Sequence, residues 1–485
     1  MSQLITAMCI AFFLQSPPDG HVMDGRFSDW AQENPAAPDD GRGLIRAVRV
    51  SDDPHHVYVQ IDLDQPRTLQ WLEEELRLEF DLDGTTRTGL TGYDGMEGVE
   101  AVVVFSPIEP GRDRTKPGAT LYGAKQDGSA AQTTVDALGV VAMPTHSGDR
   151  FEIRLDRSPA FTSDSFRLQC ITRDRAQVRD RTPFIEHAFT SKASKRAAKP
   201  IHDPAQAPAA GEIRVVSWNG EFGALFKNPN PFKRSFQALQ PDIVLLQELP
   251  DKLAPKKLSD WFDTLDRKQS WTTSVGGQSL CVAVATPHPM EPVSELSPVR
   301  KLAPGGKGNI VRATGGLIRI GKRTILAVAV HLKCCGRLGS SEDEKRRAEA
   351  EAIHEAVRLA IKRLKPDGVV IGGDFNLVGG PGILATLARK LAPGGGDLVV
   401  SEPIRPRGDD TTTWGRKGES FVPGRLDFIL YGGSLQATSE DILDVTQLGA
   451  SWRRKHRIPE EPPSDHLPIK IDLAWEPVTQ ERPTP

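Results

Sequence analysis

The stretch Gly372-Gly373-Asp374-Phe375-Asn376 places a carboxylate and an amide close together after an apolar run. The run at 369–371 is typical of a buried strand, and the two glycines allow a sharp turn at the strand's end. Asp374 could activate a nucleophile, and Asn376 could help to hold it. Taken alone, the stretch predicts either this catalytic pair or an ordinary polar turn, and both interpretations stay open at this point.

Further apolar runs in the second half of the chain lead into, contain or follow residues that could hold a metal or a phosphate. The runs are 213–218, 242–246, 324–330, 425–430 and 467–473, and the polar residues are Asn219, Gln247, Glu248, His331, Asp427, Asp465 and His466. In α/β sheets the ligand crevice commonly lies at the carboxyl ends of the strands. We therefore expect these side chains to meet at one edge of a sheet.

At least one helix is expected between these strands. Ser341 and Glu344 have the spacing of a capping box, which marks a helix start. Apolar residues at 353, 357, 360, 361 and 364 then recur at helical spacing, so this helix should pack one face against a core.

Six short motifs of the second half occur in a characteristic order. They are Trp218-Asn219, Gln247-Glu248, His331-Leu332, Gly373–Asn376, Arg425–Leu430 and Ser464–His466. With these motifs, residues 212–475 resemble the endonuclease/exonuclease/phosphatase superfamily, which has the deoxyribonuclease I-like fold. The resemblance implies a four-layer α/β sandwich, in which two mixed β-sheets are flanked by helices.

A divalent cation is the expected cofactor of this region. Carboxylate and amide oxygens suit a hard cation, and Asn219, Glu248 and Asp465 supply them. Mg²⁺ needs only one or two carboxylates besides water and substrate oxygens, so this sparse set of ligands fits it. We expect Mg²⁺ or Mn²⁺, with Ca²⁺ as an alternative.

The resemblance also implies roles for five catalytic residues. Asp374 would orient or deprotonate the attacking water, and Asn376 would help to hold that water. His466 would contact the phosphoryl group, while Asp427 would fix the tautomer of His466 and raise its pKa. His331 would donate to a second phosphate oxygen. Such a site neutralises and positions a phosphodiester whose own charge repels nucleophiles.

The first half has the pattern of an all-β sandwich. Apolar and polar residues alternate at 57–63, 76–82 and 151–155, as in half-buried strands. Residues 24–30, 57–59 and 81–84 resemble family 9 carbohydrate-binding-module-like domains, which implies a glycan as a partner. Trp30 and Trp71 could stack on a sugar, although packing is the favoured interpretation. Asp81 and Asp83 could hold Ca²⁺, although a plain turn is favoured.

The domain organisation follows from shifts in composition. Residues 20–190 are expected to form the β-sandwich domain and residues 212–475 the α/β domain. Residues 191–211 are rich in Ala, Pro and Lys and are expected to form a linker, and 476–485 a tail. The apolar run Leu4–Leu14 is too short to span a bilayer. It is either a signal peptide over 1–19, which would make the protein secreted or periplasmic, or a buried first element.

Composition places few limits on function. The chain of 485 residues is 38% hydrophobic and 26% charged, with a net charge of −3, as in soluble globular proteins. The second half is mildly basic, which allows an anionic substrate without the strong positive charge of a dedicated nucleic-acid binder. The five cysteines are too few for a disulfide scaffold. The adjacent Cys334 and Cys335 are not expected to bridge each other easily.

These observations favour a secreted, metal-dependent phosphodiesterase acting on DNA or RNA as a monomer, without a transmembrane segment. A sphingomyelinase-type phospholipid phosphodiesterase and an inositol-type phosphatase remain alternatives, because they share the same core residues. Bases between the site motifs, such as Arg407 and Arg416, could line a groove for nucleic acid. A non-catalytic glycan-binding protein is the alternative from another class. It is disfavoured, because no acid or histidine of the motifs is missing.

Overall fold

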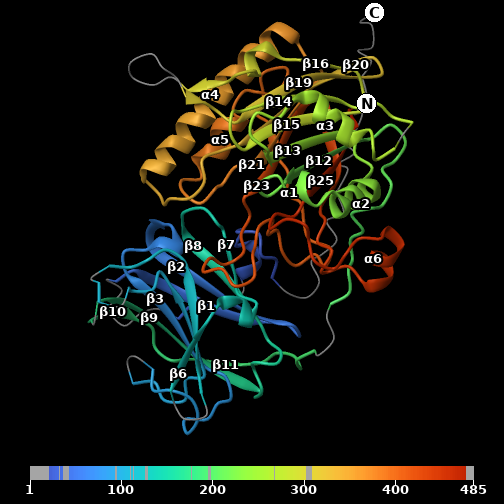
Figure 1. Cartoon of the computed structure of the whole chain (residues 1–485). Coiled ribbons are helices and arrows are strands. Elements are labelled where there is room, and N and C mark those ends of the chain that lie inside the picture. Colours follow the sequence, from blue (N-terminus) through green and yellow to red (C-terminus); the bar gives the residue numbers. More distant parts are fainter. Residues whose placement is uncertain are drawn as a thin grey trace, which may run out of the picture.

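The computed structural model describes residues 21–476 apart from 32, 37–42, 93–94, 110, 113, 126–128, 176, 195–197, 267 and 302–308. The expected signal peptide at 1–19 lies outside the described residues, so secretion stays a prediction. The described residues form two groups of sheets that follow one another along the chain (Figure 1). No helix or strand occurs among the described residues of 191–211, and the domain boundaries stay predictions.

The first half is all-β, as expected. Its strands are β1 (Ile45–Asp52), β2 (His56–Arg67), β3 (Glu75–Asp81), β4 (Ala101–Phe105), β5 (Ala119–Ala124), β6 (Ala130–Thr133), β7 (Val141–Met143), β8 (Gly148–Asp156), β9 (Ser165–Asp174), β10 (Gln177–Arg181) and β11 (Ile185–Ala188). One sheet has the order β1-β2-β8-β7, and the other has the order β10-β9-β3-β4-β5-β6, with β11 also paired to β9.

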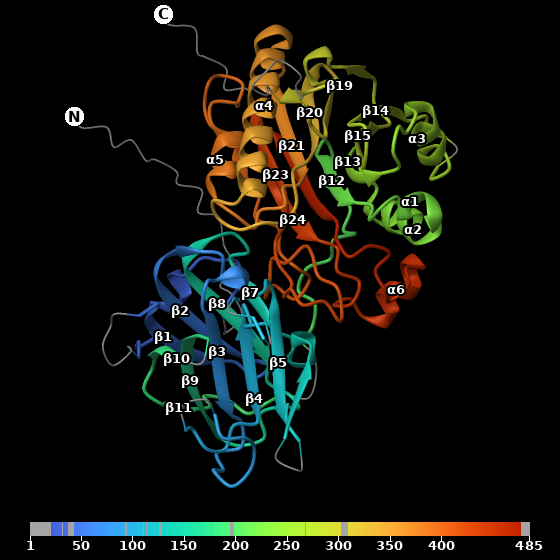
Figure 2. The same ribbon diagram turned by 60° about the vertical axis from the view of Figure 1, so that its left-hand side comes forward.

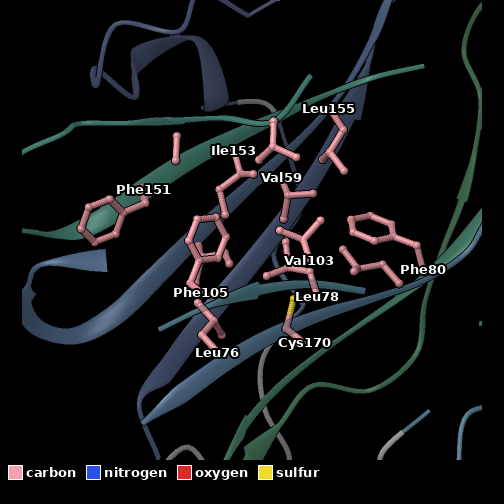
Figure 3. Packing of buried hydrophobic residues seen from close by; sticks show 14 of the residues in the cluster. Val59, Leu76, Leu78, Phe80, Val103, Phe105, Phe151, Ile153, Leu155 and Cys170 are labelled. Carbon is pink, nitrogen blue, oxygen red and sulfur yellow. The ribbon is translucent and has the colours of Figure 1, made fainter. Parts of the chain in front are cut away.

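The core of the first half lies between these two sheets (Figure 3). Every second residue of β2 from Val57 to Leu63 belongs to this core, together with Leu78 and Phe80 of β3. Trp30 is buried and donates from Nε1 to the Glu152 carboxylate at 3.2 Å, so it packs inside the protein and has no face for a sugar.

The acids of the β3 turn mainly serve the turn itself. Asp81 Oδ1 accepts from the Gly84 amide at 2.7 Å, and Asp83 Oδ1 accepts from the Thr85 amide at 2.8 Å. Oxygens of Asp81, Asp83 and Glu100 do lie within 4.8 Å of one another. Asp81 also pairs with Arg167, which balances part of this charge.

The second half contains two six-stranded sheets and six α-helices among its described residues. The strands are β12 (Ile213–Asn219), β13 (Ile243–Leu249), β14 (Thr272–Gly276), β15 (Cys281–Thr286), β16 (Met290–Pro292), β17 (Arg300–Lys301), β18 (Asn309–Ile310), β19 (Ala313–Ile320), β20 (Arg323–His331), β21 (Gly368–Asp374), β22 (Val399–Val400), β23 (Asp427–Gly433), β24 (Leu435–Ile442) and β25 (Ile469–Trp475). The helices are α1 (Ala224–Lys227), α2 (Pro229–Leu239), α3 (Pro255–Phe262), α4 (Ser341–Leu364), α5 (Gly382–Ala388) and α6 (Ala450–His456).

The two sheets stack face to face between layers of helices. Their orders are β14-β15-β13-β12-β25-β24 and β16-β19-β20-β21-β23-β22. Along β13, Leu245 belongs to the core between the sheets, whereas Leu246 faces the core beneath α2 and α3. On the other side, α4 and α5 cover the sheet that contains β20 and β21 (Figure 2). Both faces of the central strands β13, β20 and β21 are buried, so their sequences are largely apolar. The predicted four-layer α/β sandwich is confirmed.

The helix expected after Ser341 is α4. Its N-cap is Ser340, whose hydroxyl accepts from the Asp343 amide at 3.3 Å, so the cap lies one residue before the predicted one. Ile353, Val357 and Ala360 pack into the core, as their spacing predicted.

The glycines before Asp374 lie within β21 rather than in a turn, so the predicted sharp turn is wrong. Gly373 pairs with Val330 of β20 and with Phe428 of β23. A Cβ on Gly373 would lie 1.9 Å from the Val330 carbonyl oxygen. The close approach of the β20 backbone therefore requires glycine at position 373, and Asp374 follows at the end of β21.

We expect Gly373→Ala to cost about 2–3 kcal/mol of stability and to displace Asp374, because β20 or β21 must shift. Urea unfolding with and without the substitution measures this effect. Gly382→Ala, where a new Cβ meets nothing within 4 Å, is the matched control and should unfold like the unsubstituted protein. Equal stability of Gly373→Ala would show that the two strands are less closely packed than described.

The two halves contact each other through loops of the second half. Met23 forms a parallel bridge with Asp410, the Ser147 amide donates to the Gly379 carbonyl at 2.9 Å, and Val422 packs into the core of the first half. None of the helices in the described part of the chain has the length and apolar character needed to span a bilayer.

Candidate active site

The strand registers bring the predicted site residues to one end of both sheets. In the parallel pair β12–β13, Asn219 lies opposite Gln247, the neighbour of Glu248. In the other sheet, Asp374 at the end of β21 lies opposite His331 in β20 and opposite Asp427 in β23. Asn219 Nδ2 donates to Asp374 Oδ2 at 3.1 Å, so the site joins the two sheets.

His466 and Asp427 form a buried ion pair. His466 Nδ1 lies 2.8 Å from Asp427 Oδ2, and both side chains are almost fully buried. Burial disfavours the charged ring, but the Asp427 carboxylate outweighs burial and raises the pKa of His466 to about 10. His466 is therefore protonated at neutral pH, and its Nε2 points toward Asp374 Oδ2 at 3.9 Å.

Asp374 lies at the centre of the site. Its Oδ1 accepts from the Asn376 amide at 2.9 Å, and its Oδ2 lies 3.5 Å from His331 Nε2. Burial raises the pKa of Asp374 to about 7, although the charge of His466 acts in the opposite direction. A carboxylate with this pKa can exchange a proton at neutral pH.

His331 is neutral. Burial, together with the nearby charges of Arg312 and His466, holds its pKa well below the ordinary value. Its Nε2 lies 3.7 Å from Glu248 Oε1, and its buried Nδ1 has no hydrogen-bond partner. A neutral imidazole can donate one hydrogen bond or offer one nitrogen to a metal.

Glu248, His331 and Asp374 form a group that could hold a cation. One ligand atom of each lies within 4.8 Å of the others. Two carboxylates on an inner surface, beside a histidine held neutral, fit a divalent ion because its charge would offset theirs. In the structure Asn219 Oδ1 accepts from the Glu221 amide at 3.0 Å, so its predicted role as a metal ligand stays a prediction.

Asp465 has other partners. Its Oδ2 accepts from Trp414 Nε1 and from Arg416, each at 3.1 Å. Its backbone amide donates to Glu221 Oε2 at 3.2 Å. These contacts place Asp465 beside the site rather than in the group of Glu248, His331 and Asp374, and its predicted role as a ligand stays a prediction.

Asn376 also has a structural task. Its φ is 48°, in the left-handed region, and its side-chain Nδ2 donates to the Leu332 carbonyl at 3.2 Å. The buried Arg346 donates to the Asn376 carbonyl at 2.7 Å. Asn376 therefore ties the end of β21 to the segment after His331.

A strained loop after Asn219 was missed in the sequence. Glu221, Phe222 and Gly223 all have left-handed backbone, with φ of 38°, 48° and 77°. The Phe222 amide donates to Glu248 Oε2 at 2.9 Å, and its ring is 60% exposed. Strain of this kind tends to occur at functional sites. No sequence signal marks this loop, except that Gly220 and Gly223 flank it.

Three of the solved structures that are similar to this chain are the following, and each has low sequence identity to it. The human Nocturnin catalytic domain with bound sulfate anion is 19% identical, with 56% of this chain and 96% of that chain covered and a TM-score of 0.36. Beta toxin 275-280 from Staphylococcus aureus is 18% identical, with 53% and 99% covered and a TM-score of 0.36. ANGEL2, a 2',3'-cyclic phosphatase, is 14% identical, with 54% and 95% covered and a TM-score of 0.37.

No curated protein matches the chain in a sequence search. The sequence profile of the Endonuclease/Exonuclease/phosphatase family, in contrast, matches residues 216–466. The match begins in β12 and ends at His466, and it includes every residue of the site described above. The resemblance seen in the motifs is thereby confirmed, and the chain belongs to the Endonuclease/Exonuclease/phosphatase family.

Proposed function

We propose that this phosphoesterase-type hydrolase is a divalent-metal-dependent phosphodiesterase that cleaves nucleic acid by in-line attack of water on phosphorus. The observation that carries the proposal is the row of buried groups Asp427, His466 and Asp374. It places a fixed positive charge next to a carboxylate whose pKa is near neutral. A cation and a proton acceptor side by side are what attack on an anionic phosphodiester requires.

Each group has a distinct task in this proposal. Asp374 accepts the proton of the attacking water. The backbone amide of Asn376 donates to the Asp374 carboxylate and keeps it in place. His466 donates from Nε2 to a phosphoryl oxygen, because Asp427 holds the proton at Nδ1. His331, held neutral by burial, donates to a second oxygen.

Glu248 and Asn219 would hold a cation such as Mg²⁺ or Mn²⁺, with Asp374 beside it. When bound, the cation supplies positive charge to the phosphoryl oxygens and lowers the pKa of a bound water. The left-handed backbone of Glu248, with φ of 53°, and the bond from the Phe222 amide fix this carboxylate before any ligand arrives.

Metal affinity should depend on the protonation of Asp374. Its pKa of about 7 means that a cation beside Glu248 must displace a proton from Asp374 at lower pH. Below that pKa the apparent affinity for Mn²⁺ should fall about tenfold per pH unit, and above it the affinity should level off. Calorimetric titrations with Mn²⁺ at about pH 6 and about pH 8 measure this linkage. Asp374→Asn should show much less pH dependence, and equal affinity of the unsubstituted protein at both pH values would contradict the assignment.

The rim of the site favours nucleic acid among the phosphodiesters. The aromatic residues Phe222 and Trp414 lie beside Glu248 and Asp465, and the exposed Arg416 pairs with Asp465 and Glu221. Bases stack on such rings regardless of sequence. Among the described residues the large exposed apolar side chains belong to segments that lie far apart in the sequence. They are Phe184, Ile201, Phe222, Leu338, Leu359, Val399 and Phe421.

A substrate panel tests the proposal. With Mn²⁺, we expect hydrolysis of plasmid DNA or RNA to exceed that of sphingomyelin and inositol phosphates. Phe222→Ala should raise the KM for a single-stranded oligonucleotide about tenfold, because one stacking contact is lost. Its effect on bis(p-nitrophenyl) phosphate should be far smaller. Phe184→Ala removes another exposed phenyl ring, in the first half, and is the matched control. Preference for sphingomyelin or inositol phosphates would overturn the nuclease assignment.

A further inference from the structure

Two adjacent cysteines lie a few residues beyond His331 and have no task in the proposed reaction. The Cys335 thiol donates to Cys334 Sγ at 2.8 Å, so the two sulfur atoms are in contact. Cys335 is exposed and Cys334 is partly buried, and both are free thiols. The other two cysteines of the described residues, Cys170 and Cys281, are buried in the cores.

The backbone and charges around this pair favour a reactive thiolate. Cys335 has a left-handed φ of 69° and Gly336 follows with 85°, so the chain turns tightly and brings the sulfurs together. Lys333 Nζ lies 3.9 Å from Cys334 Sγ. The thiol of Cys335 and the charge of Lys333 together lower the pKa of Cys334 to about 6.

The same turn is tied to the site through Arg346. This buried guanidinium donates from Nη1 to the carbonyls of Lys333 at 2.8 Å, Cys335 at 3.1 Å and Asn376 at 2.7 Å. A shift of the Cys335 backbone must therefore move either the Arg346 guanidinium or the Asn376 backbone. The backbone amide of Asn376 donates to the Asp374 carboxylate.

We propose that Cys334 and Cys335 form a redox-active pair that closes to a reversible vicinal disulfide in the presence of a low-molecular-weight disulfide, and that closure lowers the activity of the adjacent site. In the first step the Cys334 thiolate attacks one sulfur of the small disulfide and releases one thiolate. In the second step Cys335, after losing its proton to solvent, attacks Cys334 Sγ and releases the second thiolate. The protein loses two electrons, and the small disulfide is reduced to two thiols.

Ring strain makes this disulfide easy to reduce. Adjacent Cα atoms are about 3.8 Å apart, whereas bridged cysteines usually have Cα atoms about 4.4–6.8 Å apart. Strained and exposed disulfides have the less negative potentials typical of regulatory bonds. The bond should therefore form only under oxidising conditions and open with a mild dithiol reductant. The expectation that adjacent cysteines do not bridge easily concerns this strain, which the proposed disulfide retains.

Mass spectrometry of the full chain tests the chemistry without any assay of activity. After treatment with oxidised glutathione, the peptide containing both cysteines should lose two hydrogen atoms, and dithiothreitol should restore them. Cys335→Ser should instead stop at a mixed disulfide of Cys334 with glutathione. Two free thiols after treatment, or glutathione retained on both cysteines of the unsubstituted protein, would overturn the proposal.

Activity tests the coupling to the site, and this part rests on the proposed function. Oxidation should lower kcat on bis(p-nitrophenyl) phosphate about fivefold or more, and dithiothreitol should reverse the loss. Cys334→Ser, treated in the same way and assayed without reduction, should keep the activity of the reduced protein, because it cannot form the bond. If the disulfide forms and kcat is unchanged, the coupling is wrong. If the reduced protein hydrolyses no phosphodiester, the proposed function fails while the mass result still stands.

Discussion

We expect replacement of His466 with glutamine to lower kcat on a phosphodiester by about 10³-fold or more, with the fold retained. The ring of His466 is charged because Asp427 raises its pKa to about 10, and it is the buried cation that faces Asp374. Glutamine keeps a hydrogen bond to Asp427 but carries no charge and no transferable proton. Steady-state kinetics with Mn²⁺ on bis(p-nitrophenyl) phosphate measure the loss.

A histidine–aspartate pair outside the site provides the control. His288 Nε2 lies 3.1 Å from Asp242 Oδ1 near the β15–β16 connection. His288→Gln should leave kcat within about twofold, as is usual for a surface change away from the chemistry. A His466→Gln enzyme that keeps more than a tenth of the activity would remove His466 from the proposed reaction.

We expect replacing Asp410 with alanine to destabilise the protein by about 3 kcal/mol, because two buried guanidinium groups each lose one carboxylate partner, while Arg405 keeps Asp444 and Arg154 keeps Asp409. Asp410 Oδ2 accepts from Arg154 of the first half at 3.0 Å and from Arg405 of the second half at 2.8 Å. The charges of the two arginines outweigh burial and lower the pKa of Asp410. The stability that this carboxylate contributes is present above its unfolded pKa and is lost as the pH falls through the lowered folded pKa.

Equilibrium urea unfolding at neutral pH measures the effect of Asp410→Ala. Asp260→Ala removes the carboxylate of the exposed Lys256–Asp260 pair and is the control. It should leave the urea midpoint unchanged, since exposed pairs contribute little. If both variants unfold alike, the two halves are not held together by the buried charges.

The sequence was most informative about the strands and their ends. Both faces of β12, β13, β20 and β21 are buried, so each strand appears in the sequence as an apolar run. The polar residue that follows such a run therefore marks the end of the strand. The register of the paired strands then brings these strand ends, and their polar residues, close together. The alternation in β2 identified the first half as β-structure, because Val57, Val59 and Ile61 face the apolar core, while Tyr58 on the other face is buried in a second cluster.

Contacts between distant segments were not readable in the same way. The glycines before Asp374 predict a turn, because the sequence does not show that the Val330 carbonyl approaches Gly373. Asp465 contacts Trp414, Arg416 and Glu221, which lie far from it in the sequence. The left-handed loop at Phe222 and the ion pair between Arg154 and Asp410 leave no local pattern, because their energies arise only after folding.

Anomalous diffraction from crystals soaked in Mn²⁺ and a phosphodiester analogue tests the central claim most directly. We predict a Mn²⁺ ion bound by Glu248, with the phosphoryl group of the analogue in contact with His466 Nε2 and close to Asp374. Manganese bound only at the other acidic group, Asp81, Asp83 and Glu100, or an analogue that avoids His466, would contradict the account.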